Sequence, residues 1–453
     1  MCGGALKYSH VIVVGGGIAG LLAAAAVAPY AERVSVLERD RLSGGTGPRA
    51  GVPQGRHLHT LLSSGARAID QLLPGTLSHL YQHGARHLSF PGDVLMYGSW
   101  GWLRGEPRQY ILGATRPLIE ESVRAMLLKH YSSVSLLERC RVTRLIVDSS
   151  RVRGVLFFNA EKKEEEMAGD LVVVSSGRSA DALSWLQHTG FKGTVRKELI
   201  DAGLGYASRA VRPHPDDAEK YACVSVQAEP GAGVPGRAGF IIGTENGDWM
   251  VTLSGTKGAT PPVSDEGFLE FASGLRHPLI HQLLERATPT GKIFGYRHTQ
   301  NARYRLDSVR NLPSGVLFIG DTVAQFNPAY AHGMSVAALA ALEVVQGLGR
   351  DKELHALQRA VCRAGHTAWA LSTSADARYP GAVASRVISK PFLNKMADRL
   401  QATAATSPRV GDAFADVLTL SEPLHVLARP AVISRILKGP TAPPSHVPPR
   451  SRP

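Results

Sequence analysis

The chain has 453 residues, of which 44% are hydrophobic and 20% are charged, so it has enough apolar surface for a packed core and is long enough for two or three domains. The formal net charge is +13 at pH 7, but the basic residues are spread along the chain and are not interleaved with aromatic residues in one stripe. Composition and charge therefore indicate a globular protein and argue against nucleic acid as its partner.

Two further features of the sequence concern the compartment. The four cysteines lie far apart and show neither CxxC nor another metal-ligand spacing, which is typical of a reducing compartment. No apolar stretch reaches the roughly 18 to 20 residues that a membrane-spanning helix needs. We therefore expect a cytoplasmic protein without a transmembrane segment, and peripheral contact with a membrane stays open.

The first forty residues show the pattern of a βαβ unit. A β-branched run at 11–14 predicts a strand, the glycines at 15–17 predict a turn, the alanine-rich run at 18–28 predicts a helix, and 33–37 predicts a second strand. Because the apolar run follows a strand and a glycine turn, we interpret it as a helix of the fold and not as the core of a signal peptide. Strand, helix and strand in this order begin an α/β domain.

The following segments alternate between two architectures. Helical periodicity at 58–73 and 116–130 and three strands within 142–175 continue the α/β pattern. Period-two strands divided by Gly and Pro turns at 203–254 instead indicate an antiparallel sheet. A strand, a turn and a helix at 315–348 return to the first pattern, so the first domain is expected to be discontinuous in sequence.

The glycine turn of the βαβ unit has the spacing of a dinucleotide-binding motif. Gly15 permits the tight turn, Gly17 lets the backbone approach a pyrophosphate, and Gly20 allows close packing of helix on strand. The N-terminus of the helix then faces the phosphates. Glu38 ends the second strand, where an acid binds ribose hydroxyls and disfavours a 2′-phosphate. The expected contacts in this unit are Gly15, Gly17, Ile18, Ala19, Gly20, Glu38 and Arg39.

A second motif indicates that the dinucleotide is FAD. A strand at 315–319 leads to Gly320 and Asp321, and the segment up to Gly333 and Met334 opens a helix of small residues. This resembles the second FAD motif of flavoprotein hydroxylases, in which the Asp meets the ribityl chain and the helix N-terminus points at the flavin. Backbone N–H groups of Gly333 and Met334 would face the region of a reduced flavin that carries negative charge.

The segment 49–65 is the most specific of the chain, and it contains Arg49, Gln54, Arg56 and His57. It resembles the corresponding loop of the squalene-epoxidase-like flavoprotein monooxygenases, and in particular of the bacterial epoxidases that oxidise polyketide polyenes in polyether biosynthesis, a branch of secondary metabolism. Together with the two motifs above, it identifies the chain as similar to that family.

The resemblance, which runs over about 11–348, implies roles for individual residues. Arg49 and Gln54 would lie near the flavin ring or the pyrophosphate, Arg116 would touch FAD, and Pro328 would pack beside the isoalloxazine ring. The chain departs from its relatives at 174–178, where Val-Ser-Ser-Gly-Arg replaces an acid and threonines, so the docking of a nicotinamide stays undefined. The implied FAD contacts outside the first unit are Arg49, Gln54, Arg56, His57, Arg116, Gly320, Asp321, Pro328, Gly333 and Met334, of which Pro328, Gly333 and Met334 are also the expected catalytic positions.

Patterns and resemblance together predict an α/β fold. It comprises an FAD-binding Rossmann-like domain of the glutathione-reductase type, an inserted antiparallel-sheet substrate domain and a C-terminal helical region. The expected order is a first FAD-binding segment at 1–85, substrate-domain strands at 86–114, a second FAD-binding segment at 115–200, the substrate domain at 201–300, a third FAD-binding segment at 301–350, C-terminal helices at 351–438 and a disordered, proline-rich tail at 439–453.

Two short motifs suggest other chemistry. His57 and His59 have the spacing of a metal pair, but no carboxylate or cysteine nearby completes a site, so we interpret them as loop histidines packed by the cofactor and predict no metal. Trp100-Gly101-Trp102 is similar to the WxW of flavin halogenases, but it lacks the Ile-Pro that follows there and lies too early in the chain. We interpret it as apolar lining of the substrate pocket.

The resemblance implies an FAD-dependent monooxygenase that epoxidises carbon–carbon double bonds of a hydrophobic polyene with O₂ through a flavin C4a-hydroperoxide. Electrons would come from NAD(P)H or from a separate flavin reductase, and the two sources stay open. An alkene has no proton to lose, so no catalytic base is required.

Alternatives in function and in the C-terminal region stay open. An aromatic hydroxylase of the same superfamily would need a polar group such as Tyr206, His332 or Arg209 near the flavin, and a flavin redox sensor would need no turnover. The C-terminal helices could pack on their own domain, cover the active site, pair subunits or lie on a membrane.

Overall fold

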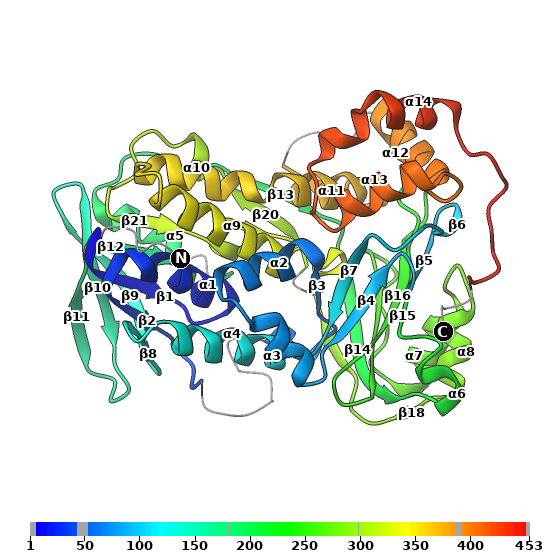
Figure 1. The fold of residues 1–453 in the computed structure, drawn as a ribbon, viewed down its shortest axis with the longest axis horizontal. Coiled ribbons are helices and arrows are strands. Elements are labelled where there is room, and N and C mark those ends of the chain that lie inside the picture. The colour runs from blue at the N-terminus through cyan, green and yellow to red at the C-terminus, as the bar shows by residue number, and fades with distance from the viewer. Residues whose placement is uncertain (1–5, 43–52, 179–180, 298, 386–390, 450–453) are drawn as a thin grey trace.

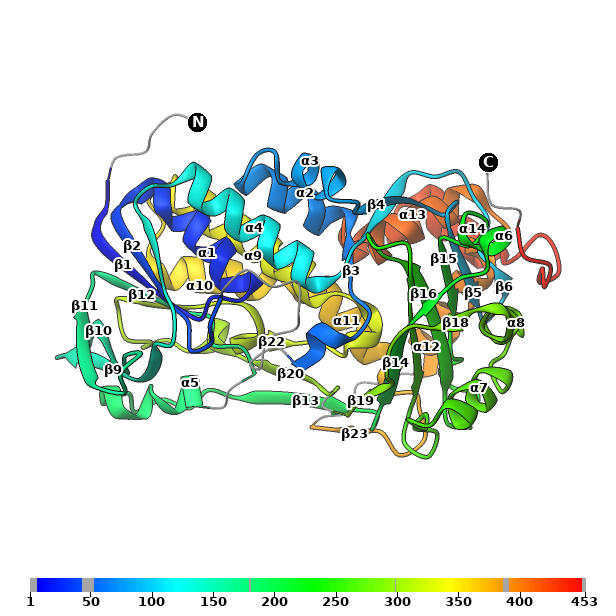
Figure 2. The ribbon, with the colours of Figure 1, turned by 90° about the horizontal axis from the view of Figure 1, so that it is seen from below.

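The computed structural model describes residues 6–42, 53–178, 181–297, 299–385 and 391–449. Two sheets at opposite ends of the long axis organise the molecule (Figures 1 and 2). The fold class predicted from the sequence is confirmed: a Rossmann-type α/β domain carries a mainly antiparallel sheet domain and a C-terminal helical region. No helix among these residues is both long and apolar enough to span a membrane.

The first sheet is parallel and has the order β21-β12-β1-β2-β8. Its strands are β1 (Tyr8–Val14), β2 (Ala31–Leu37), β8 (Val134–Leu137), β12 (Leu171–Val174) and β21 (Val316–Phe318). Val14 pairs with both Leu37 and Val174, so the carboxyl ends of three neighbouring strands meet at one edge. Ligands of open α/β sheets bind beyond this edge.

Helices cover one face of this sheet, and a small antiparallel sheet covers the other. Helix α1 (Ile18–Val27) is buried along nearly all its length because it lies between the sheet and the helices α4 (Arg116–His130) and α9 (Gly333–Leu348). Burying a Leu or Val side chain contributes about 1.5–3 kcal/mol, so this layer is a major source of stability. The opposite face packs against β10 of a sheet formed by β9 (Arg141–Asp148), β10 (Arg151–Phe158) and β11 (Glu164–Ala168).

The second large sheet combines strands from distant regions of the chain. Its order is β18-β14-β17-β16-β15-β5-β6, and β19 also pairs with β14. All of its pairs are antiparallel except β15 with β5, which joins the segment at 94–98 to the segment at 223–226. The strands are β5 (Val94–Gly98), β6 (Gly101–Trp102), β14 (Gly205–Arg212), β15 (Cys223–Val226), β16 (Arg237–Gly243), β17 (Trp249–Gly255), β18 (Thr288–Pro289) and β19 (Phe294–Tyr296).

Two smaller sheets connect the large ones, and one of them contains a strand where the sequence predicted a helix. The first consists of β3 (Thr60–Leu62), β4 (Arg86–Phe90) and β7 (Gln109–Gly113), and the second of β13 (Lys197–Asp201), β20 (Asn301–Tyr304), β22 (Ala324–Gln325) and β23 (Val383–Ala384). A helix was expected over 58–73, but α2 (Ser63–Leu72) begins at Ser63. The reason is that Thr60–Leu62 pairs with β7, and periodicity alone does not reveal such a distant partner.

The remaining helices pack on several different parts of the molecule. Helices α3 (Thr76–Gln82) and α10 (Leu354–Ala364) lie along the first domain, whereas α7 (Asp265–Ser273) and α8 (Leu279–Arg286) back the second large sheet. Helix α11 (His366–Asp376) packs against β13 and β20 of the connecting sheet. Helices α12 (Pro391–Ala404), α13 (Pro408–Leu418) and α14 (Pro430–Lys438) pack on one another and lie beside the second large sheet in both views (Figures 1 and 2). Two further helices, α5 (Asp181–Ser184) and α6 (Pro215–Ala218), are only one turn long.

The proline-rich tail was expected to be disordered, but residues 439–449 of it run over the second domain. Ser445 forms a bridge with Gly101, and the backbone N–H of Trp102 donates to the Ser445 carbonyl at 2.9 Å. The indole of Trp102 donates to the carbonyl of His446 at 3.2 Å, and the hydroxyl of Tyr97 lies 2.8 Å from Nδ1 of His446. The tail therefore contacts β6 through an isolated bridge and hydrogen bonds, which its composition does not indicate.

Candidate active site

A cavity of about 970 Å³ lies between the two large sheets. It begins at the glycine turn after β1 and reaches the second large sheet and the C-terminal helices, so residues from both domains line one continuous space. This size is in the range of sites that enclose a cofactor or a small ligand. Most of the site residues predicted from the sequence line this cavity.

Three glycines of the turn at the first end of the cavity are needed for different reasons. Gly15 has a φ of +100°, a conformation that favours glycine. A Cβ at Gly20 would lie 1.8 Å from the Gly15 carbonyl oxygen, so only glycine allows this contact between helix and turn. A Cβ at Gly17 would meet no atom within 4 Å, and no side chain caps the helix that follows. The open position and the unpaired N–H groups of α1 fit a bound pyrophosphate.

Glu38 and Arg39 line the same end of the cavity, at the end of β2. The buried carboxylate of Glu38 accepts hydrogen bonds from the backbone N–H of Gly16 at 2.7 Å and of Asp40 at 2.9 Å. These bonds orient the carboxylate at the end of β2, the position at which an acid binds ribose hydroxyls in dinucleotide-binding folds. Cys140, in the loop after β8, and Arg141 and Val142 of β9 complete this wall, and the sequence offered no signal for them.

The loop after β12 and the segment after β21 meet at the middle of the cavity. Asp321 lines it, and Arg178 donates from Nε to the Asp321 carboxylate at 3.3 Å and from its terminal nitrogen to the Phe326 carbonyl at 3.3 Å. The hydroxyl of Ser176 is buried without a hydrogen-bond partner among the described residues, and Ser176 also lines the cavity. A hydroxyl in this situation fits a hydrogen bond to a bound cofactor. Sequence reasoning assigned no contact to Ser176 or Arg178.

The N-terminus of α9 points into the cavity beyond Asp321. Pro328, Gly333 and Met334 line the cavity, and α9 begins at Gly333 without a side-chain cap. Ala331 has a φ of +55°, which turns the chain from the short helix at Pro328–Tyr330 into α9. Since a Cβ at Gly333 would meet no atom within 4 Å, a ring can approach the backbone N–H groups there. These features fit the flavin of an FAD molecule whose pyrophosphate lies at Gly17.

The loop residues at 54–59 divide between the cavity and its surroundings. His59 and Arg116 line the cavity; burial, with a smaller contribution from Arg116, lowers the pKa of His59 to about 3. His57 is not a lining residue, because its Nδ1 lies 2.9 Å from the Ser208 hydroxyl and its ring packs edge-on against Tyr206 at 4.6 Å. Arg56 instead stacks on a neighbouring ring, that of Phe294 at 5.0 Å.

The other predicted contacts have these positions. Ile18 and Ala19 line the cavity, whereas Gly20 and Gly320 lie behind it; a Cβ at Gly320 would lie 2.5 Å from Ala19. Arg49 lies outside the described residues, and so does the side chain of Gln54. Within the described residues, no three His, Cys, Asp or Glu side chains gather as a metal site would need.

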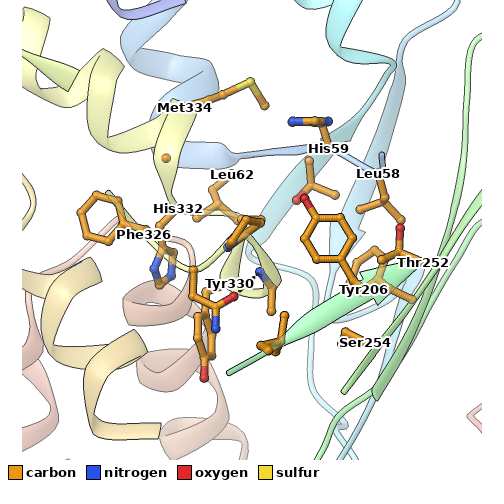
Figure 3. A pocket seen from close by; sticks show the side chains of 18 of the residues that line it. Leu58, His59, Leu62, Tyr206, Thr252, Ser254, Phe326, Tyr330, His332 and Met334 are labelled. Carbon is orange, nitrogen blue, oxygen red and sulfur yellow. Dashed lines mark hydrogen bonds between the residues drawn. The ribbon is translucent and has the colours of Figure 1, made fainter. Parts of the chain in front are cut away.

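The far end of the cavity takes its shape from the alternation of the second large sheet. In β17, Val251 and Leu253 pack in the core beneath α7 and α8, so Thr252 and Ser254 face the cavity. Tyr206 of β14 lies beside them with its hydroxyl toward His59 (Figure 3). Apolar side chains close the remaining walls, among them Leu58, Leu62, Phe90, Val94, Met96, Ile111, Phe240 and Phe326.

The C-terminal helices also contribute to this far end, and so does the hairpin of β5 and β6, which we call the Trp100 hairpin. Gln401, Phe414 and Leu418 of α12 and α13 line the cavity, so these helices cover the site, one of the roles left open by the sequence. Trp100 and Gly101 line it as well, as expected for the Trp-Gly-Trp motif, whereas Trp102 is fully buried beneath the tail.

The titratable groups at the far end hold their neutral forms near pH 7. Burial raises the pKa of Tyr206 well above its ordinary value, and burial lowers the pKa of His332 to about 4. His332 is 3% exposed, and its Nδ1 has no hydrogen-bond partner among the described residues. The third polar candidate, Arg209, faces Asp265 at 3.2 Å and does not line the cavity. The charged lining residues, Glu38, Arg39, Asp40, Arg116, Arg141, Arg178 and Asp321, lie along the stretch that fits the cofactor.

The chain resembles known proteins in part of its sequence and in its fold. Residues 10–183 match the profile of a protein family described as FAD dependent oxidoreductase. Over 455 aligned residues, the chain is 28% identical to protein Rv3254 of Mycobacterium tuberculosis, covering 94% of this chain and 93% of that protein.

Solved structures share the fold at lower identity. The flavin-dependent brominase Bmp2 is 16% identical with a TM-score of 0.63, and it covers 90% of this chain and 93% of its own. The myxobacterial chondrochloren halogenase CndH, an FAD-dependent halogenase, is 16% identical with a TM-score of 0.60, at 91% and 96% coverage. p-Nitrophenol 4-monooxygenase PnpA from Pseudomonas putida is 14% identical with a TM-score of 0.64, at 92% and 98% coverage. Residues 10–183 therefore resemble the FAD dependent oxidoreductase family in sequence, and the chain shares the fold of these flavin-dependent halogenases and of PnpA.

Proposed function

We propose that the protein is an FAD-dependent monooxygenase that epoxidises carbon–carbon double bonds of a hydrophobic polyene, as the polyether epoxidases do. The observation that carries the proposal is the neutrality of the far end of the cavity. Tyr206 keeps its proton near pH 7, and burial makes His332, with a pKa of about 4, a weak base, so neither is suited to remove a proton from a substrate. Epoxidation needs no such step.

In this proposal bound FAD, once reduced, would supply the oxygen-transfer chemistry. The protein would position the ring and the substrate and keep water out of the cavity. The N–H groups at Gly333 and Met334 would stabilise negative charge on the ring, and Pro328 would pack beside it. The apolar walls at Leu62, Phe326 and other positions would orient the double bond and keep water away from it. Reducing equivalents would come from NAD(P)H or from a separate flavin reductase.

Hydroxylation of a phenol is the second candidate. Tyr206 lines the cavity and its hydroxyl lies toward His59, so it could contact the oxygen of a phenol bound at this end (Figure 3). PnpA, which shares the fold, is a p-nitrophenol monooxygenase. A phenol must lose its proton during the reaction, and a positioned acid or base contributes about 10²–10⁴-fold to such steps.

An assay with two substrates and one variant separates the candidates. The holoenzyme is supplied with ¹⁸O₂, NADPH and a flavin reductase, together with a neutral conjugated polyene or a phenol, and the products are analysed by mass spectrometry. We expect one ¹⁸O atom in an epoxide of the polyene, and we expect Tyr206→Phe to retain polyene activity within about twofold, because no proton moves through this residue.

Other results would favour other functions. Oxygen inserted into the phenol alone, with a loss of about 100-fold or more in Tyr206→Phe, would replace the epoxidase by a hydroxylase. FAD bound without turnover would favour a redox sensor.

A further inference from the structure

A buried carboxylate lies behind the loop that leads into α9. Asp376, the last residue of α11, is 1% exposed and is not a lining residue of the cavity. One of its oxygens accepts hydrogen bonds from the side-chain amides of Asn301 at 2.7 Å and Asn327 at 2.9 Å, and the other accepts one from the Tyr330 hydroxyl at 2.7 Å. All three donors are neutral, so this arrangement differs from an ordinary buried ion pair.

These bonds fix the turn that carries Pro328. Asn327 and Tyr330 stand on either side of Pro328, and both are tied to the same carboxylate. The side-chain oxygen of Asn301 accepts from the backbone N–H of Asn327 at 2.9 Å, and the Asn327 side chain accepts from the N–H of Ala329 at 3.1 Å. The turn is therefore held by hydrogen bonds on the side away from the cavity, and Pro328 lines the cavity on its other side.

The charge of Asp376 is open to change near neutral pH. Burial raises the pKa of Asp376 to about 6, although the hydrogen bonds from Asn327, Tyr330 and Asn301 lower it. The titratable groups around it are Tyr330 in the loop, Asp201 on β13 and Tyr379 after α11; Asp201 raises the pKa of Asp376 further. Above about pH 6 the ionised carboxylate can accept from all three donors, and a proton on either oxygen removes acceptor capacity.

We propose that Asp376 is a positioning residue of the flavin site: its carboxylate holds the turn at 327–330 and thereby sets Pro328 and the N-terminus of α9 against the isoalloxazine ring. The inference requires FAD in the cavity but does not depend on which substrate is oxidised.

The test uses the full chain and the bound flavin as the readout. Asp376→Asn keeps the size of the side chain and can still accept from Asn301, while its amide faces the oxygen of Tyr330. Asp398→Asn is the matched control, since it removes a charge from α12 that pairs with Arg378 and does not touch the loop. The FAD dissociation constant and the visible absorbance and circular dichroism of bound FAD are measured from pH 5 to 8.5.

We expect Asp376→Asn to shift the spectrum of the bound flavin and to raise the FAD dissociation constant about tenfold at pH 8, which corresponds to the loss of one hydrogen bond to a charged group. The wild type should show a spectral transition with a midpoint near pH 6, and at pH 5 it should resemble the variant, which lacks the transition. Asp398→Asn should follow the wild type.

A variant that melts at lower temperature but binds FAD with the wild-type affinity, spectrum and pH profile would overturn the proposal, because Asp376 would then only join α11 to β20. If Asp376→Asn does not fold, Tyr330→Phe removes one of the three hydrogen bonds; a spectral shift in the same direction supports the proposal, and an unchanged spectrum and affinity overturn it. No substrate is present, so failure to oxidise a polyene would contradict the proposed function and leave this result unaffected.

Discussion

The two ends of the cavity are built in opposite ways. At the cofactor end, a few contiguous residues from Gly15 to Gly20 and the strand ends at Glu38 and Asp321 supply backbone N–H groups and charges. At the substrate end, β14, β17, the Trp100 hairpin and α13 each supply neutral side chains. A ligand with fixed chemistry can be bound by a short local motif, whereas the shape of a variable substrate requires walls from the whole chain.

The largest effects are expected at Gly20, which packs tightly against the protein, and at Gly17, which is open to a ligand. Gly20→Ala places a Cβ 1.8 Å from a backbone oxygen, so we expect a loss of about 3 kcal/mol in the free energy of unfolding and loss of FAD binding. Gly17→Ala meets no protein atom, so the apoprotein should melt at the wild-type temperature while FAD binds at least about tenfold more weakly. Thermal melting of the apoprotein and FAD titration check both expectations. Normal FAD affinity in Gly17→Ala would show that the pyrophosphate does not lie at this turn.

An intermediate effect should come from His332, which lines the cavity directly before Gly333. Its folded-state pKa of about 4 lies below the value of about 6.5 in the unfolded chain, so the unfolded state binds the proton first and stability is lost as pH falls from 6.5 toward 4. Between pH 7 and pH 5 the wild type should lose about 2 kcal/mol more than His332→Phe. Urea denaturation at both pH values gives the comparison, and equal losses would mean that His332 is already solvated in the folded protein.

The smallest effect should be confined to the substrate end. Phe414→Ala removes an apolar wall, so the KM for a hydrophobic substrate should rise about tenfold while the FAD dissociation constant stays unchanged. Phe392→Ala is the control from the same helical region, because Phe392 is 71% exposed and does not line the cavity. A change in FAD affinity in Phe414→Ala would show that the two ends are not independent.

The same contrast explains what could be predicted from the sequence. The glycine turn, Glu38 and the Gly320–Met334 segment are legible because each is a local pattern whose residues stay neighbours in the fold. Asp376 and Arg178 were missed because their partners, Tyr330 and Asp321, lie 46 and 143 positions away along the chain. Sequence spacing carries no information about such distant pairs.

His57 and the C-terminal helices show the same limit in other forms. His57 belongs to a segment that resembles a cofactor loop, yet its ring supports Tyr206 and does not line the cavity. An amphipathic helix shows which face is apolar but not what covers that face, so the position of α13 over the cavity required the structure.

The contact between the tail and the Trp100 hairpin has a consequence for biosynthesis. Trp102 and His446 are separated by 344 positions, so at about 5–20 residues per second a ribosome makes the second roughly 20–70 s after the first. During this interval the hairpin has no partner for the backbone N–H and the indole of Trp102, and one wall of the substrate end is not yet fixed. The nascent chain can therefore form its glycine turn early, whereas the wall at the far end of the cavity is completed only after Ser445 and His446 have been made.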